Sequence, residues 1–470
     1  MDSYYLSQEV IKNARPILGA SVADILAKMR RDGAEICGLG VANRPLLDIL
    51  PALGVTALTV RDRRPLDPTL CERIARLGGR IIEGDGWLRG LSHGVIFRTP
   101  SLRPDTPALC EARRRGAIVL TEVALFLALC PSRIYAVTGS DGKTTTAMMT
   151  AAMLETAGRR VYLGGNIGTP LLAALPTMRT EDAAVIELSS FQLSDLMPPR
   201  GRTAITNISE NHLDWHTDMH EYTAAKARIL GGGVSVLNAD CPPVAALAPL
   251  GDSILFSSQH RPRDNRPALF CDRDAVVLWH GNVTRLFRTE AVALPGRYQL
   301  ENAMAAAGLA LDAAPPEAME EALRGFHGPR HRREYVGRFL GVDCYDSSID
   351  TTPARTAATL STFGGRVVLL LGGRGKRVSY EPLAEAVAAH AALTVATGEE
   401  APAIAEALGS LCPDIPLVRV EGFREAVLTA LRLAGECGVL LLSPACTSFD
   451  AFPGYEARGE AFRAILQDAT

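Results

Sequence analysis

The chain has 470 residues, too many for one compact hydrophobic core, so we expect several domains. Hydrophobic residues make up 47% and charged residues 21%, and the net charge is −3, which excludes a global basic field; we expect no nucleic-acid partner. No apolar run reaches the ~18 residues of a membrane span, and the N-terminus lacks the apolar stretch of a secretion signal. We therefore expect a cytoplasmic protein without membrane insertion, whose scattered cysteines are reduced.

Apolar strand-like runs alternate with helical stretches, a pattern that predicts parallel α/β architecture. The first third opens with AEICGLGVANRPLLDIL (34–50), where a short strand runs into a glycine turn and a helix. The other strands expected in this third lie at 55–60, 94–100 and 117–120, before a linker at 130–133.

The central third begins with a strand in IYAVTG (134–139). Its further strands are expected at 161–165, 183–189, 203–209 and 234–238. Short β-like pieces and polar turns at 251–292 suggest an antiparallel insertion, and a helix is expected within 295–314.

A basic connector, HGPRHRRE (327–334), leads to the last third, with strands expected at 342–346, 366–373, 393–398 and 439–445. The predicted fold class is therefore α/β with three domains. They are a Rossmann-like domain (1–132), a central domain with a parallel sheet of the P-loop ATPase kind (133–328) and a second Rossmann-like domain (329–470).

The stretch YAVTGSDGKTTTAMM (135–149) is typical of a phosphate-binding loop, but it is shortened. The pattern G-x-x-x-x-G-K-[ST] would need a glycine where the chain has Val137. Gly139 and Gly142 still permit a tight turn that brings backbone N–H groups to an anion, and Lys143 supplies a positive charge. We expect a nucleotide here; the alternative is a glycine turn that happens to carry a lysine.

A carboxylate follows at the end of the next strongly apolar strand, AAVIELSS (183–190), where Glu187 stands. Mg²⁺ prefers hard oxygen ligands, and the Thr144 hydroxyl beside the loop is a second one. By itself a glutamate at a strand end is usually solvated, but beside a phosphate loop a metal contact is the better interpretation.

The segment ITNISENHLDWHTDMHEYTAAKARIL (205–230) carries three histidines and several acids, with Lys226 on the following helix. His212 and His216 have an H-x-x-x-H spacing that zinc ligands can have, but a zinc site would also need a helix and a third ligand. Zinc is therefore disfavoured. Spacing alone would make Lys226 an exposed helix lysine.

Taken together, these motifs resemble the Mur ligase family, ATP-dependent enzymes that add amino acids to the peptidoglycan precursor. The loop TGSDGKTT is similar to the family's short phosphate loop, in which the early glycine is absent. The motifs most similar to the member that adds glutamate are GGNIGTPL (164–171), ELSSFQLSDL (187–196), NHLDWH (211–216), LLLGGRGK (369–376) and LLSPACTSFDAF (441–452). The resemblance covers essentially the whole chain.

The resemblance implies an ADP-forming ligase that uses ATP and Mg²⁺. ATP would phosphorylate the terminal carboxylate of UDP-N-acetylmuramoyl-L-alanine, and the amine of D-glutamate would then attack the acyl phosphate. It implies a monomer that serves cytoplasmic cell-wall synthesis, and thereby cell shape and division. The first domain would bind the sugar nucleotide, the central domain ATP and the last domain the amino acid.

By the same resemblance, the phosphates are surrounded by Gly139, Ser140, Asp141, Gly142, Lys143, Thr144 and Thr145. The implied metal ligands are Thr144, Glu187, His212 and Lys226, the last as a carbamate, which would turn a cation into an oxygen ligand. The implied catalytic group is Lys143, Glu187, His212 and Lys226. The further nucleotide contacts implied are Asn302, Arg332 and Asp346, although HRRE (331–334) alone reads as a solvated charge run.

The sugar-nucleotide contacts that the resemblance implies are Gly40, Val41, Asp62, Arg63, Asn166, Ser189 and Gln192. The implied glutamate contacts are Lys376, Ser448, Phe449 and Tyr455. Without the resemblance, the glycines at 38 and 40 are a weak Rossmann-type signal, because Asn43 stands at the third glycine position. SPACTSFD is equally compatible with Ser or Thr capping a helix.

The chain departs from the family pattern at a few positions. Asp141 replaces a frequent asparagine, Asn211 a frequent aspartate, and Tyr298-Gln299 a frequent His-Asn pair. In DSSIDTTP (346–353) Ser348 stands where many members have a lysine, and the acceptor-contacting threonine is Thr351 or Thr352. L-Glutamate as acceptor is thus an alternative. The others are a folylpolyglutamate synthase-like ligase, a nucleotide-gated binding module and a nicotinamide dehydrogenase.

Overall fold

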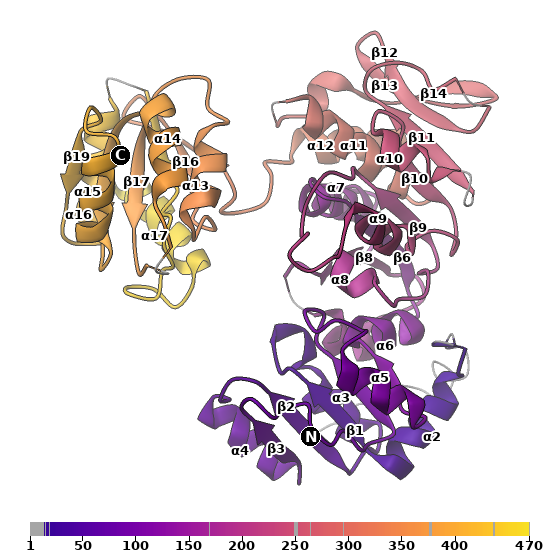
Figure 1. Cartoon of the computed structure of the whole chain (residues 1–470). Coiled ribbons are helices and arrows are strands. Elements are labelled where there is room, and N and C mark those ends of the chain that lie inside the picture. The colour runs from indigo at the N-terminus through magenta and orange to yellow at the C-terminus, as the bar shows by residue number, and fades with distance from the viewer. Residues whose placement is uncertain are drawn as a thin grey trace. The chain divides into compact units, whose positions relative to one another are not determined.

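Figure 1 shows the chain as a computed structural model, which contains two compact units, Met1–Phe326 and His327–Thr470. The structure describes residues 14, 16–17, 19–168, 170–248, 252–263, 265–294, 296–375, 378–435 and 438–469. Its strands form one sheet of five strands, one of nine and one of six. The predicted fold class, α/β with three mainly parallel sheets, is confirmed. The boundary at 132/133 stays a prediction, because both of the first two sheets lie in the first unit.

The first sheet is fully parallel, with strand order β3-β2-β1-β4-β5. Its strands are β1 (Ala34–Cys37), β2 (Leu58–Asp62), β3 (Arg80–Glu83), β4 (Val95–Arg98) and β5 (Ile118–Leu120). Its helices are α2 (Val22–Asp32), η1 (Val41–Asn43), α3 (Leu46–Ala52), α4 (Pro68–Arg76), α5 (Pro107–Arg114) and α6 (Glu122–Leu129). The chain order reverses between β1 and β4, so the turn after β1 lies where parallel α/β sheets bind ligands.

The second sheet has the order β14-β13-β12-β11-β10-β9-β6-β8-β7. Its strands are β6 (Arg133–Thr138), β7 (Val161–Gly165), β8 (Ala183–Glu187), β9 (Arg202–Ile205), β10 (Ser235–Asn238), β11 (Ser253–Ser257), β12 (Ala268–Asp272), β13 (Ala275–His280) and β14 (Asn282–Arg288). Strands β12, β13 and β14 pair antiparallel, which confirms the predicted antiparallel part, and the remaining pairs are parallel.

Helices cover both faces of this second sheet, and alternate residues of β6 point to opposite faces. Tyr135 and Val137 point into the cluster formed with helices α7 (Lys143–Thr156), α11 (Arg297–Ala310) and α12 (Pro316–Arg324). Ile134 and Ala136 point to the opposite face and a different cluster. That face carries the shorter elements η2 (Leu171–Thr177), α8 (Ser190–Leu193), α9 (Met219–Ala227) and α10 (Pro242–Ala245); η4 (Thr289–Ala291) follows β14. Fully buried strands of this kind read as continuous apolar runs.

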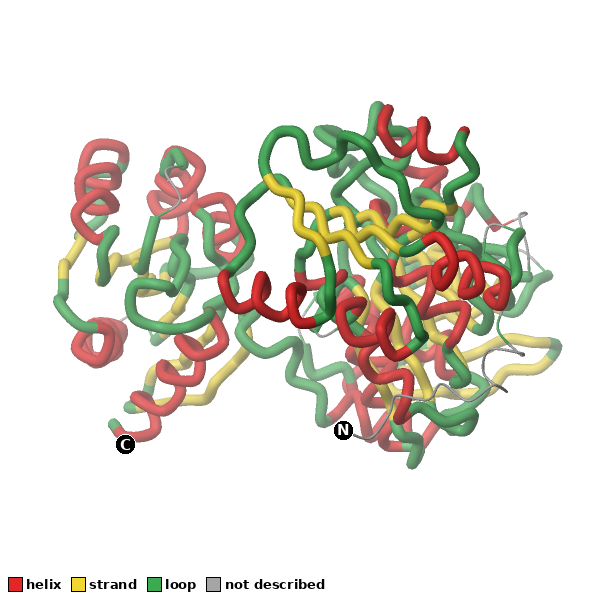
Figure 2. The backbone as a smooth tube through the Cα atoms, turned by 90° about the horizontal axis from the view of Figure 1, so that it is seen from below, coloured by secondary structure: helices red, strands yellow, loops and turns green. Residues whose placement is uncertain are grey.

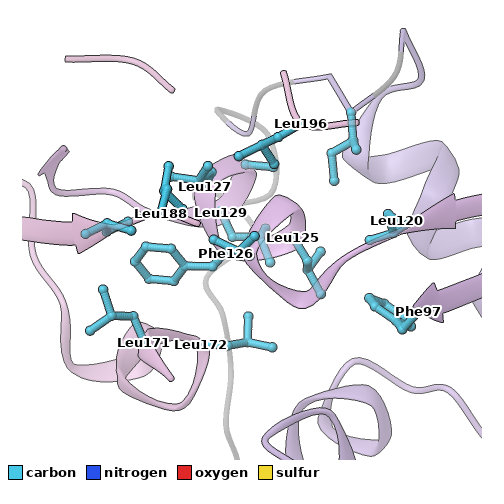
Figure 3. Packing of buried hydrophobic residues seen from close by; sticks show 14 of the residues in the cluster. Phe97, Leu120, Leu125, Phe126, Leu127, Leu129, Leu171, Leu172, Leu188 and Leu196 are labelled. Atoms are coloured by element: carbon cyan, nitrogen blue, oxygen red, sulfur yellow. The ribbon is translucent and has the colours of Figure 1, made fainter. Parts of the chain in front are cut away.

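Helix α6 joins the first two sheets into one apolar cluster. In Figure 3 its Leu125 and Phe126 lie between Phe97 and Leu120 of the first sheet and Leu188 after β8. Because this cluster is continuous, the first two sheets share one core.

Glu122, at the start of α6, is buried in this apolar junction, and burial raises the pKa of its carboxyl to about 8 from an ordinary 4.5. Unfolding therefore releases a proton between these pH values, so stability falls as the pH rises through this window. We expect Glu122→Gln to raise the melting temperature, and this gain should grow from pH 5 to pH 8. A gain that is the same at both pH values would contradict the buried, protonated carboxyl.

The third sheet, in the second unit, has the order β15-β16-β20-β17-β18-β19 and only β15 antiparallel. Its strands are β15 (Glu334–Phe339), β16 (Val342–Asp346), β17 (Val367–Gly372), β18 (Ala391–Thr397), β19 (Leu417–Arg419) and β20 (Val439–Leu442). Helices α13 (Pro353–Leu360), α14 (Glu381–His390) and α15 (Ala401–Leu411) cover one face, and α16 (Phe423–Ala434) and α17 (Tyr455–Asp468) cover the other. Figure 2 shows these helices in red around the yellow strands.

Three strands were not predicted from the sequence: β3, β15 and β19. Their residues are mostly half-buried or exposed, so they lack a strong apolar run. Among the described residues, no helix combines the length and apolar character that crossing a membrane requires.

Candidate active site

The phosphate loop leaves β6 at Thr138 and enters α7 at Lys143, so backbone N–H groups of a helix start lie at the carboxyl edge of the sheet. Gly142 has φ 77°, and a Cβ added there would lie 2.2 Å from Asn302 Oδ1. A Cβ on Gly139 would lie 1.9 Å from Thr206 Oγ1. Both glycines are thus required by close packing of the loop against the strand ends and α11.

The segment that follows β9 holds this loop through hydrogen bonds. The Ser209 N–H donates to Ser140 Oγ at 2.9 Å, and the Asp141 N–H donates to Asn207 Oδ1 at 2.8 Å. The Thr206 hydroxyl donates to the Asp141 carbonyl at 2.6 Å. The Asp141 side chain is exposed, so its charge is solvated.

Glu187 lies beside the loop as the sequence predicts, and it is buried. Its carboxylate accepts a hydrogen bond from Thr144 Oγ1 at 2.8 Å and one from Asn166 Nδ2 at 2.9 Å. The three predicted residues thus bring a carboxylate, a hydroxyl and an amide together. Oxygen donors of this kind fit Mg²⁺.

Two lysines converge on the backbone of the loop. Lys143 Nζ donates to the Gly139 and Ser140 carbonyls at 3.0 and 2.8 Å, and Lys226 Nζ donates to the Gly139 carbonyl at 2.7 Å. Lys226 is 1% exposed, so it is not the surface lysine that its spacing alone suggested. Burial, together with the charge of Lys143, lowers the pKa of Lys226 well below its ordinary value.

The two histidines of the H-x-x-x-H pair have different surroundings. His212 has φ 56° and packs edge-on against Phe191, with ring centroids 4.9 Å apart; burial lowers the pKa of its imidazole, which favours the neutral form that a metal ligand needs. His216 is buried, with Nε2 2.9 Å from Ser190 Oγ. In the part of the chain that the structure describes, neither belongs to a cluster of three possible metal ligands.

Asn302 lies under the loop. It is buried, its Oδ1 accepts a hydrogen bond from Thr146 Oγ1 at 3.3 Å, and its Nδ2 donates to Gln299 Oε1 at 3.1 Å. Gln299 thus orients the Asn302 amide, against which Gly142 packs. Thr145 is buried in the first turn of α7, and the adenine contact predicted for Asn302 stays a prediction.

The residues predicted for the sugar nucleotide gather at two places. Asp62 Oδ2 accepts a hydrogen bond from the Leu39 N–H at 2.8 Å, which ties the end of β2 to the turn that carries Gly40 and the exposed Val41. Arg63 is exposed beside Asp62. Asn43, at the missing glycine position, donates from Nδ2 to the Gly38 carbonyl at 2.9 Å and so closes the same turn.

Ser189 and Gln192 form the second place, at the start of α8. The Gln192 N–H donates to Ser189 Oγ at 3.2 Å, and Gln192 Oε1 accepts from the Ser189 N–H at 2.9 Å, a reciprocal capping box. Arg98 of the first sheet supports the far end of this helix, since its guanidinium pairs with Asp195 and donates to the Phe191 carbonyl.

In the second unit, Asp346 ends β16 and Tyr455 starts α17. Asp346 Oδ2 lies 2.7 Å from His331 Nδ1, and the His331 and Tyr455 rings are 6.1 Å apart. Arg332 is exposed next to His331. Ser448 is buried and Phe449 is 60% exposed in the turn after β20. Lys376 lies outside the described residues.

Ser348, which stands where many family members have a lysine, is buried beside Arg458. Its Oγ accepts a hydrogen bond from Arg458 Nε at 3.0 Å and donates to the Tyr455 carbonyl at 2.8 Å. A lysine at 348 would place a second cation against this buried guanidinium. A neutral serine that accepts a hydrogen bond therefore suits the position beside Arg458.

Sequence reasoning missed several residues that shape these sites, among them Tyr222, His331 and Arg458. Tyr222 OH lies 2.9 Å from Ser140 Oγ. Burial lowers the pKa of His331, but the hydrogen bond to Asp346 and the charge of that carboxylate outweigh burial, so the pKa is raised. The only sequence signals were an aromatic residue four positions before Lys226 and a histidine within a basic run, and both are common in ordinary surfaces.

Residues 137–310 match the Mur ligase middle domain, and residues 331–446 match the Mur ligase glutamate ligase domain. The UDP-N-acetylmuramoylalanine–D-glutamate ligase of Symbiobacterium thermophilum is 38% identical, over 93% of this chain and 98% of that protein. The ligase of the same name from Clostridium novyi is 36% identical, over 94% of this chain and 97% of that protein. The solved UDP-N-acetylmuramate-alanine ligase of Thermotoga maritima has a TM-score of 0.52 at 18% identity, over 93% of this chain and 99% of that one, a likeness of fold alone.

Proposed function

The chain belongs to the Mur ligase family, and from this premise we propose that it adds D-glutamate to UDP-N-acetylmuramoyl-L-alanine. It is an ATP-dependent, ADP-forming ligase of peptidoglycan precursor synthesis and uses Mg²⁺. The identity of the two substrates rests on the similarity to D-glutamate ligases along almost the whole chain. We further propose that it works as a monomer in the cytoplasm.

The observation that carries the proposal is the convergence of Lys143, Glu187 and Lys226 on one phosphate loop. In the proposed reaction the loop N–H groups and Lys143 bind the phosphates of ATP and neutralise their charge. Phosphoryl transfer to the alanine carboxylate needs mainly such positioning and charge neutralisation.

Mg²⁺ would supply further charge neutralisation at the phosphates when bound. Thr144 and Glu187 would hold one ion, and His212 and Lys226, as a carbamate, a second. The donors fit this assignment, because the buried Glu187 carboxylate already gathers oxygen-bearing groups and burial lowers the pKa of the His212 imidazole, which favours its neutral form. Asn166 would then have two roles, orienting Glu187 and facing the muramoyl-alanine.

For the acceptor, Ser448, Phe449, Tyr455 and Lys376 are the proposed contacts, with Arg332 and Asp346 near the nucleotide. Glutamate carries two carboxylates, so at least one cation and several neutral donors are needed to hold it. Lys376, which the family resemblance assigns to the acceptor, is the proposed cationic partner, whereas Arg458 is engaged by Ser348 and by backbone carbonyls.

The test is phosphate release with UDP-N-acetylmuramoyl-L-alanine, ATP and Mg²⁺ against a panel of amino acids. We expect release with D-glutamate, and a kcat/KM for L-glutamate lower by about 10³-fold, since the inverted centre misplaces either the amine or a carboxylate. A matched control replaces the sugar nucleotide with UDP-N-acetylmuramate, which has no alanine and therefore lacks the carboxylate that would be phosphorylated. Faster turnover of L-glutamate would favour the alternative acceptor, and no release with either amino acid would refute the proposal.

A further inference from the structure

His216 is the second histidine of the H-x-x-x-H pair, and none of the roles assigned above uses it. It lies one turn beyond His212, because its N–H donates to the His212 carbonyl at 2.9 Å. Its side chain is fully buried. A buried imidazole that belongs to no metal cluster in the described chain calls for another explanation.

The ring of His216 lies among other aromatic rings. The ring centroids of Trp215 and Tyr222 lie 4.6 and 5.3 Å from it, both nearly perpendicular, and that of Phe191 lies 5.9 Å away. Edge-to-face contacts of this kind fix ring orientation. Burial lowers the pKa of His216, which favours the neutral form of the ring.

On one side the ring reaches helix α8. Its Nε2 lies 2.9 Å from Ser190 Oγ, the first residue of that helix. Ser190 directly follows Ser189, a proposed muramoyl-alanine contact. Among the described residues, Nδ1 has no hydrogen-bond partner, and the nearest carboxylate, Glu221, is 4.0 Å away. The Nε2 contact is thus the polar bond that holds the ring.

On the other side the ring reaches the phosphate loop through Tyr222. The Tyr222 hydroxyl lies 2.9 Å from Ser140 Oγ, and its ring lies 4.6 Å from Lys226 Nζ. A change in the packing of Tyr222 would therefore move both a loop residue and the proposed metal-binding lysine.

The loop after β4 contacts the turn at Trp215 and His216 from outside. Trp215 Nε1 donates to the Ser101 carbonyl at 2.9 Å, and the Arg103 guanidinium lies 4.9 Å from the Trp215 ring and pairs with Glu221 at 2.9 Å. Contacts from the loop after β4 thus hold Trp215 and Glu221 on either side of His216, whose buried side chain lies between α8 and α9.

We infer that His216 is a positioning residue that aligns the start of α8, through Ser190, with the phosphate loop, through Tyr222. It touches no reacting group itself. Its hydrogen bond to Ser190 fixes the position of the α8 start, which is assigned to the sugar nucleotide. Its ring packs against Tyr222 and so fixes the position of the phosphate loop, which is assigned to ATP. This inference rests on the proposed function, because it assigns the α8 start to the muramoyl-alanine.

Two substitutions separate the bond from the ring. His216→Phe keeps the ring and removes Nε2, so the Kd and KM for UDP-N-acetylmuramoyl-L-alanine should rise about tenfold while those for the nucleotide stay within about twofold. His216→Gln keeps a polar group near Ser190 and removes the ring. The constants for the nucleotide should then rise about tenfold, while those for UDP-N-acetylmuramoyl-L-alanine stay within about twofold. Calorimetric binding of the sugar nucleotide and of ADP with Mg²⁺, beside phosphate release, gives both constants.

Ser190→Ala removes the same bond from the other partner and leaves the aromatic cluster intact, so it serves if a His216 variant fails to fold. It should reproduce His216→Phe, and the double variant should be no worse than either. Equal effects of both His216 substitutions on both ligands, or an unchanged sugar-nucleotide constant in Ser190→Ala, would overturn the inference while wild-type turnover still supports the proposed function. Absence of wild-type phosphate release would instead count against the proposed function.

Discussion

Lys143→Ala is expected to abolish ADP formation, lowering kcat/KM for ATP by at least about 10³-fold, or about 4 kcal/mol of transition-state stabilisation. The lysine lies at the helix start with its Nζ against the loop carbonyls, so it can place its charge where the phosphates would sit. Measuring ADP production at saturating sugar nucleotide and amino acid checks this.

The same variant should bind UDP-N-acetylmuramoyl-L-alanine within about twofold of wild type, because the first-sheet turn at Gly40 and Asp62 is a separate place in the structure. Lys28→Ala is the matched control, since Lys28 is a half-buried lysine on α2 that pairs with Asp32, and it should keep full activity. If Lys143→Ala lost sugar binding as severely as ADP formation, the division of roles between the two sheets would be wrong.

Lys226→Ala is expected to be inactive, with a loss of about 10³-fold, and to recover part of its activity when short carboxylates such as acetate are added. The physical reason is the state of the amine. Its pKa lies well below the ordinary value, so a neutral amine is available to react with carbon dioxide and form a carbamate. An added carboxylate can enter the space that the truncated side chain leaves and supply the missing oxygen atoms.

Lys226→Arg tests the charge separately from the carbamate. Arginine keeps a cation but cannot be carbamylated, so it should be as inactive as alanine and should not respond to acetate. Full activity of either plain variant would remove the carbamate from the mechanism, and mass spectrometry of the intact wild-type protein with labelled bicarbonate gives a readout independent of turnover.

Ser348 shows how a departure from a family pattern gains a physical explanation in three dimensions. Along the sequence, Ser348 is only a missing lysine. In the fold it accepts a hydrogen bond from the buried Arg458, which comes from α17, 110 residues later. No local pattern in DSSIDTTP could reveal that partner.

The α/β class, most of the strands and the phosphate loop follow from the sequence alone, because glycine conformations and apolar runs are local properties of the chain. The motif resemblance also assigns Glu187, His212 and Lys226 to the site, and these assignments stay predictions. Only the tertiary structure decides that Lys226 is buried against the loop, that Asn302 props Gly142, and that His216 packs between α8 and Tyr222. Burial and pairing depend on which distant segments meet, and a carboxylate, lysine or histidine takes its charge state from those neighbours rather than from its place in the chain.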